Sequence, residues 1–412
     1  MDYVKKINEK LTVIVSEGEA LSSSFAIMVG TGSVNETDKT NGLSHYIEHM
    51  NFKGTNEMTA FDISNSLEMC GANFNAYTGA DVTCYYAQTL SENLEKAFSV
   101  LSSAVFRSIY PDNEVEKEKK VILEEISMSS DSPEDVCFDL SALSYFGSNG
   151  YGRTILGTSK NVTSFTKSDI LEYLAKYYVA ENVCITFAGN VNLENALNLV
   201  ERYVVPYISF EEKAKDEERN VLNLKQNLYK NKDIEQAHFC LTFNSPSYLA
   251  KNRIASEIAT TILGGGMSSR LFQKVREELG LAYSVYATSS RFKDVGTTCI
   301  YAGVNPSRVQ DAFFAILDVI KTLRTNGITD EEFNKVKCQI KSSTVFSLER
   351  VMSKAQLFAK YYLNTGKLYN VKERLSDLDL VTKQDVIDAL NYFDKNNMST
   401  AIVGKKVKPL QI

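Results

Sequence analysis

The pattern of hydrophobic and polar positions predicts a regular succession of strands and helices in the first part of the chain. Short runs that are β-branched or that alternate between apolar and polar residues, bounded by glycine, are typical of strands, whereas apolar residues three and four positions apart are typical of helices. The predicted strands are Leu11–Val15, Ser24–Gly30, Asn73–Tyr77 and Thr83–Gln88. The predicted helices are the segment after Gly42, Ala60–Met69, Glu92–Arg107 and Asn113–Met128.

The same order of elements returns in the second half of the chain. A threonine followed three residues later by aspartate opens a predicted helix at Thr166 and again at Thr382, and each helix leads through an asparagine to a strand, Val183–Ala188 or Ser399–Val403. Leu67–Gln88 is predicted to contain a helix end, a glycine, a strand, a turn and a second strand, and Arg276–Ala302 repeats this order. Such self-similarity indicates a duplicated domain. We therefore expect an α+β fold of two homologous α/β sandwich domains, each a mixed sheet covered by helices.

The two halves are separated by a charged stretch. Pro206–Asn220 is rich in Glu and Lys and poor in residues that form cores, which is typical of a linker. We expect an N-terminal domain over residues 1–207, a linker over 208–220 and a C-terminal domain over 221–412.

Composition narrows the class of protein. The 412 residues suffice for two domains, and 44% hydrophobic with 23% charged residues is typical of a soluble globular chain. A net charge of -6 without a basic block argues against a nucleic-acid partner. The start of the chain shows no secretory signal, and no apolar run is long enough to span a membrane. Seven scattered cysteines without a C-x-x-C pair suit reduced thiols, so we expect a cytoplasmic protein.

Candidate chemistry is concentrated in the predicted helix after Gly42. The chain has only three histidines, and two of them, His45 and His49, are four residues apart on this helix. That spacing stacks two imidazoles one turn apart, where both can bind a single metal ion. Glu48 lies beside them and can accept a proton from water. Two ordinary surface histidines are the alternative, but this spacing is rarely met by chance in a chain so poor in histidine. The third, His238, stands in an apolar run and is expected to be a core or strand-end residue.

A catalytic zinc site needs a third protein ligand besides its open position. The predicted helix Asn113–Met128 offers Glu118, Glu124 and Glu125, of which the first and last share one face. On a helix rich in Glu and Lys such residues more often face solvent, and spacing alone does not choose among them. Where the histidine helix should recur in the second half, Asn252–Leu263 carries isoleucines at helical spacing and no ligand. One half therefore carries the chemistry.

The residues around the histidines resemble a known family. His45-x-x-Glu48-His49 is the inverted zinc motif of the inverzincins, and Gly42–Thr55 looks like the pitrilysin/insulinase-type metallopeptidases. The sequence is most similar to the short bacterial members that resemble the catalytic subunit of mitochondrial processing peptidase. Asn51 departs from the apolar residue expected there, but it is not a ligand position. Further matching segments are Asn75–Thr78, Val121–Glu125, Gly264–Leu271 and Gly280–Ser284.

The resemblance implies a complete set of site residues. His45, His49 and Glu125 would bind one Zn²⁺ per chain, Glu118 would orient the site, and Glu48 would act as general base. Arg276 and Tyr283 of the second half would reach the bound peptide and steady the oxyanion. The edge strand to which the substrate adds would be formed by Asn75, Ala76, Tyr77 and Thr78.

The resemblance also implies two domains that face each other as a clam shell and enclose short or unfolded peptides. The sequence thus predicts a zinc-dependent endopeptidase acting on peptides, and we expect a homodimer. The alternative from another class is a non-catalytic peptide-binding or scaffold subunit of the same fold. Retention of the zinc motif together with Arg276 and Tyr283 favours the enzyme.

Overall fold

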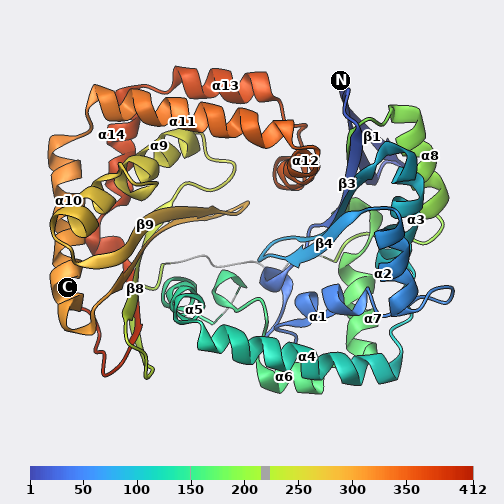
Figure 1. The fold of residues 1–412 in the computed structure, drawn as a ribbon, viewed down its shortest axis with the longest axis horizontal. Coiled ribbons are helices and arrows are strands. Elements are labelled where there is room, and N and C mark those ends of the chain that lie inside the picture. The colour runs from blue at the N-terminus through green and yellow to red at the C-terminus, as the bar shows by residue number, and fades with distance from the viewer. Residues whose placement is uncertain (149, 215–222, 412) are drawn as a thin grey trace. The chain divides into compact units, whose positions relative to one another are not determined.

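The fold is taken from a computed structural model that describes residues 1–148, 150–214 and 223–411. Their contacts divide the chain into two compact units, each built on one β-sheet (Figure 1). The first unit holds the described residues within Met1–Ser127, Arg153–Glu218 and Val345–Tyr369. The second holds those within Met128–Gly152, Arg219–Thr344 and Asn370–Ile412.

The first unit contains a six-stranded sheet in the order β1-β2-β6-β3-β5-β4. β2 and β6 pair in parallel, and the other neighbours are antiparallel. β4 is therefore an outer strand of this sheet. The strands are β1 (Asp2–Ile7), β2 (Leu11–Glu17), β3 (Ser22–Val29), β4 (Asn73–Thr78), β5 (Thr83–Leu90) and β6 (Val183–Gly189).

The second unit contains a five-stranded sheet in the order β7-β11-β8-β10-β9. β7 and β11 pair in parallel and the remaining neighbours are antiparallel, so the sheet repeats the pairing of β2-β6-β3-β5-β4 strand by strand. The predicted duplication of a mixed sheet is confirmed. The strands are β7 (Asn227–Asn231), β8 (Ala237–Ser245), β9 (Ala282–Arg291), β10 (Gly296–Val304) and β11 (Ser399–Gly404).

Helices flank both sheets, and no helix in the described part of the chain is long and apolar enough to cross a membrane. Those of the first half are α1 (Leu43–Met50), α2 (Ala60–Met69), α3 (Leu94–Phe106), α4 (Asp112–Asp131), α5 (Pro133–Phe146), α6 (Ser159–Ser164), α7 (Lys167–Tyr177) and α8 (Leu193–Tyr203). Those of the second half are α9 (Arg253–Gly264), α10 (Val309–Asn326), α11 (Asp330–Glu349), α12 (Val351–Thr365), α13 (Val371–Leu380) and α14 (Lys383–Ala389).

Two of these helices belong to the unit of the opposite half. α5, from the N-terminal half, packs on β8 and β11, and α12, from the C-terminal half, packs on β3 and β6. The cause lies in the inner strands of each sheet, which are buried on both faces. In β3, Phe25 and Ile27 join the main core, while the alternate residues Ala26 and Met28 are also fully buried and need a second cover.

The units therefore depart from the expected boundaries of 1–207 and 221–412 at these two helices. Sequence order suggested that each half would cover its own sheet. The expected linker over 208–220 lies partly outside the described residues, which omit 215–222.

Candidate metal centre

The histidine motif lies on a short helix, and residues that precede this helix hold its first turn in place. α1 follows Gly42, which has φ 99°, and a Cβ there would lie 2.7 Å from the carbonyl oxygen of Leu156. The buried carboxylate of Glu36 accepts hydrogen bonds from the backbone N–H of Gly42 and of Ser44, both 2.8 Å, and from the side chain of Asn41, 3.0 Å. These bonds occupy N–H groups that a helix start leaves unpaired, and a negative charge suits that end of the helix dipole.

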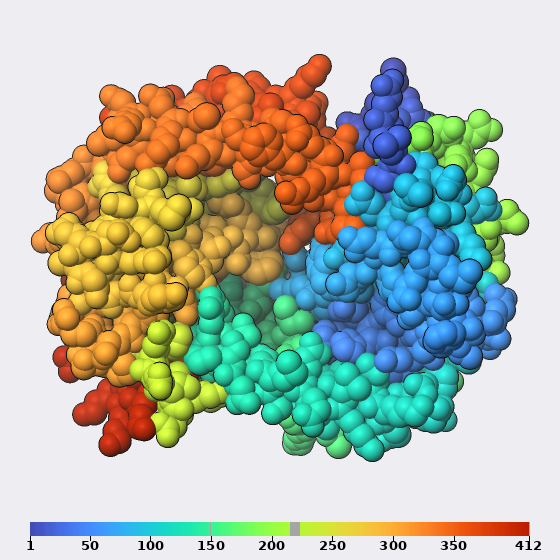
Figure 2. Space-filling model, viewed as in Figure 1, coloured from blue at the N-terminus to red at the C-terminus, as the bar shows by residue number. Residues whose placement is uncertain are grey.

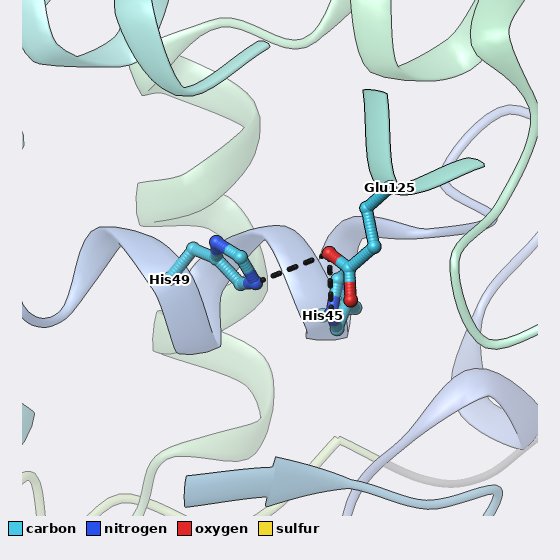
Figure 3. A group of neighbouring side chains, drawn as sticks. All are labelled: His45, His49 and Glu125. Carbon is cyan, nitrogen blue, oxygen red and sulfur yellow. Dashed lines mark ion pairs between the residues drawn. The ribbon is translucent and has the colours of Figure 1, made fainter. Parts of the chain in front are cut away.

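Three of the predicted ligands meet at one point. The Oε2 atom of Glu125 lies 3.6 Å from Nε2 of His45 and 3.5 Å from Nε2 of His49 (Figure 3). One donor atom from each of the three residues lies within 4.8 Å of the others. Donors bound to one tetrahedral zinc at about 2.1 Å stand roughly 3.4 Å apart. The geometry therefore fits a single metal ion with an open coordination position.

The electrostatics of the first histidine also suit a metal. Burial, followed by the charge of His49, lowers the pKa of His45 to about 3, so this imidazole is neutral and able to bind a cation. Burial alone would lower the pKa of His49 as well, but the hydrogen bond and the charge of Glu118 raise it. Nδ1 of His49 lies 2.7 Å from Oε1 of Glu118, which leaves Nε2 free to face Glu125.

Glu118 orients His49 from behind. Its side chain is 4% exposed, and Lys53 Nζ lies 2.6 Å from its second oxygen. Burial raises the pKa of Glu118, but the hydrogen bonds from His49 and Lys53 outweigh it, and the pKa lies below its ordinary value. Glu118 is thus an ionised partner that fixes the ring and its tautomer. Lys53 was not anticipated, because a single lysine after α1 carries no signal in sequence.

The structure distinguishes the three glutamates of α4 that spacing left open. Glu118 is buried against His49, Glu125 is half-buried and faces both histidines, and Glu124 is exposed. Glu118 and Glu125 are seven residues apart and lie on the same side of the helix, while Glu124 is turned away from it. Figure 2 shows α4, in teal, at the surface of the molecule.

Glu48 lies on α1 next to the second ligand. Its Oε2 accepts a hydrogen bond of 2.5 Å from the Thr78 hydroxyl at the end of β4. Burial raises the pKa of Glu48, and the bond from Thr78 opposes that rise. Of the other predicted strand residues, Asn75 is exposed, and Ala76 and Tyr77 are half-buried in β4, the outer strand of its sheet.

The polar residue Asn51, which departs from the family pattern, is accommodated by two tyrosines. Asn51 is fully buried, donates to Tyr85 Oη at 2.8 Å and accepts from Tyr110 Oη at 2.8 Å. Its amide is satisfied at both ends, so it carries no penalty of an unpaired buried group.

Arg276 and Tyr283 lie together in the second unit. Arg276 belongs to a π-helical segment, Phe272–Glu278, and its guanidinium lies 4.6 Å from the centre of the Phe272 ring and 5.7 Å from that of Tyr283. Tyr283 stands near the start of β9 and is 74% exposed. The remaining histidine, His238, is the second residue of β8, with Nδ1 2.7 Å from Tyr301 Oη.

Known proteins with similar sequences are named as proteases. A family model described as "Insulinase (Peptidase family M16)" matches residues 11–159, and one described as "Peptidase M16 inactive domain" matches residues 164–340. A protein of Bacillus subtilis named as an uncharacterized zinc protease is 37% identical over 365 residues, covering 89% of this chain and 88% of that protein. A protein of Rickettsia felis with a similar name is 34% identical over 406 residues and covers 97% of each chain.

The chain belongs to the M16 peptidase family. The fold agrees with this assignment. A protease from Helicobacter pylori superposes with a TM-score of 0.91 at 22% identity, covering 98% of this chain and 99% of that one. An M16 inactive domain from Pseudomonas fluorescens gives a TM-score of 0.90 at 20% identity over 100% of both chains. In M16 terms, the histidine cluster lies in the segment matched by the insulinase model, whereas Arg276 and Tyr283 lie in the segment matched by the inactive-domain model.

Proposed function

We propose that this protein is a zinc-dependent endopeptidase that cleaves short or unfolded peptides. The observation that carries the proposal is the convergence of His45, His49 and Glu125 beside the carboxylate of Glu48. The names of the relatives, which call them zinc proteases, support zinc as the metal, one ion per chain.

The residues divide the chemistry among themselves. A zinc ion held by the two histidines and Glu125 would supply Lewis-acid activation of water and of the peptide carbonyl. Glu48 accepts the proton of the attacking water and then donates it to the leaving amine. Glu118 keeps His49 in the tautomer that presents Nε2.

Substrate binding follows from the outer strand. Among the described residues β4 pairs with β5 alone, so an extended peptide can add to its other edge through the backbone of Asn75, Ala76, Tyr77 and Thr78. We further propose that Arg276 and Tyr283 steady the developing oxyanion. A homodimer in the cytoplasm remains our expectation for its state in the cell.

The test is cleavage of a mixed library of unstructured peptides, read by mass spectrometry together with the zinc content of the protein. We expect wild-type cleavage to be lost after chelation and in Glu48→Gln, with Glu48→Gln still binding zinc. Glu124→Gln is the matched control, since this exposed glutamate should leave the rate unchanged. Wild-type activity in Glu48→Gln would refute the role of Glu48.

One observation favours a second function. Residues 164–340 match a model described as an inactive domain, so a non-catalytic peptide-binding subunit is the alternative. Intact peptides in every sample, with zinc bound stoichiometrically to the wild type, would support that alternative.

A further inference from the structure

The hydroxyl of Thr78 holds the candidate general base from a neighbouring strand. Thr78 Oγ1 donates to Oε2 of Glu48 at 2.5 Å, although the two residues are 30 positions apart. This is the only hydrogen bond that Glu48 makes to another side chain within the described residues, and no lysine or arginine among them pairs with it. A glutamate side chain has several rotatable bonds, so a single anchored donor decides where its carboxylate points.

The backbone that carries Thr78 is itself firmly held. Thr78 pairs with Thr83 of β5, and Gly79 N–H donates to Val82 O at 2.7 Å in the turn that follows. The same turn accepts a hydrogen bond of 2.8 Å from Val34 N–H to Ala80 O. Thr83 is fully buried, and its hydroxyl donates to Thr31 O at 2.9 Å. The hydroxyl of Thr78 therefore starts from a fixed point, which is what a pre-positioned catalytic group requires.

We propose that Thr78 is a positioning residue that fixes Glu48 for proton transfer, in addition to ending the strand on which the peptide pairs. The inference rests on the proposed peptidase function. The bond occupies one oxygen of the Glu48 carboxylate and leaves the other to accept the proton of water. Because Thr78 also ends β4, one residue links the place where a peptide pairs to the orientation of the base. Loss of the hydroxyl should therefore slow the chemical step and leave peptide binding largely intact.

The test compares Thr78→Val with Thr78→Ser. Valine has the shape and β-branching of threonine, so the strand is preserved and only the donor is removed, whereas serine keeps the donor. With a peptide found to be cleaved by the wild type, we expect Thr78→Val to lower kcat about 10- to 100-fold, with KM changed less than about twofold. Thr78→Ser should recover most of the loss. Zinc content should stay at the wild-type value in both variants, because the Thr78 hydroxyl bonds to Glu48, which is not one of the three proposed ligands.

The matched control is Thr89→Val, which removes a buried hydroxyl from β5 that donates to Cys70 O at 2.8 Å. This variant should keep the wild-type kcat. The inference is overturned if Thr78→Val retains the wild-type kcat, if only KM changes, or if Thr78→Ser is as impaired as Thr78→Val. A wild-type protein that cleaves no peptide counts against the proposed function itself. Cleavage by the wild type with an undiminished kcat in Thr78→Val counts against the role of Thr78 alone.

Discussion

The two units share one sheet topology and differ in what they bury. In the first unit, the side chains of Glu36, His45 and Glu118 are buried, with residue exposures of 4%, 7% and 3%. In the described part of the second unit, the buried polar residues are all serines and threonines, and none is charged. Burying an ionisable group is costly unless partners satisfy it. A stable core does not need buried ionisable groups, so their presence indicates that the first unit carries the candidate metal centre.

The helices at corresponding places show how one scaffold gives both results. α1 has eight residues, begins at the buried Glu36 carboxylate and directs His45 and His49 toward α4. α9 has twelve residues, and its isoleucines Ile254, Ile258 and Ile262 all pack in the core. The fold accepts either a polar or an apolar helix at this position, so fold alone does not establish chemistry.

The two units also resemble each other because the second face of each sheet is covered by a helix. The inner strands of each sheet are buried on both faces, and each sheet takes one helix from the opposite half of the chain, α12 in the first unit and α5 in the second. In the second unit, Val136 and Cys137 of α5 are buried against Cys240 and Tyr301. Stability of the first unit therefore depends on residues more than 300 positions from the start of the chain.

The largest expected effect tests this dependence. Phe358 lies on α12 and is 2% exposed. Replacing it with alanine removes a buried ring and leaves a cavity, so Phe358→Ala should lower the free energy of unfolding by about 3–5 kcal/mol. Chemical denaturation of the full chain measures this change.

Phe346 provides the matched control for that substitution. It belongs to the same segment of the first unit but is 61% exposed. Phe346→Ala should change the free energy of unfolding by less than about 0.5 kcal/mol. Equal effects of the two substitutions would show that α12 does not cover the sheet of the first unit in solution.

A smaller effect concerns the buried charge behind the site. Glu118→Gln keeps the shape of the side chain and removes the charge that orients His49, so zinc affinity should fall about 10- to 100-fold. Competition with a chelating dye measures it. Glu116→Gln is the control, because the Glu116 side chain is 69% exposed on the same helix. Unchanged affinity in Glu118→Gln would reduce Glu118 to a packing role.

Much of this contrast could be predicted from sequence. The period of apolar residues located α2 with its observed ends, and the repeated threonine–aspartate pairs revealed the duplication because helix starts are local signals. The spacing of His45, Glu48 and His49 predicted a metal helix, since spacing along a helix fixes which side chains share a side.

What sequence did not predict depends on contacts between distant segments. Spacing placed Glu118 and Glu125 on one side of α4 but did not show that this side meets α1. Lys53 and Glu36 give no local signal, because their importance comes from a partner they meet only in the folded chain. For the same reason the sequence did not show that α5 packs on the sheet of the second unit and α12 on that of the first. An amphipathic helix does not specify which of two apolar sheets it covers.

The smallest expected effect concerns a carboxylate of the second unit that is not fully buried. Arg270 donates to Glu332 through Nε at 2.7 Å and through a terminal nitrogen at 2.9 Å, and the Glu332 side chain is 21% exposed. These hydrogen bonds hold the pKa of Glu332 below its ordinary value of 4.5. A depressed pKa stabilises the folded state fully above 4.5, and this contribution is lost as the pH falls through the folded-state pKa.

Glu332→Gln should therefore lower the free energy of unfolding by about 1 kcal/mol at pH 7, and the difference from wild type should shrink as the pH falls below 4.5. Denaturation curves at a series of pH values measure it, with the exposed neighbour Glu331→Gln as a control that should show no such trend. A difference between wild type and Glu332→Gln that is independent of pH would mean that the Arg270 pair adds no charge-dependent stability. In that case the two units would differ more strongly, because only the first unit would contain carboxylates whose charge matters.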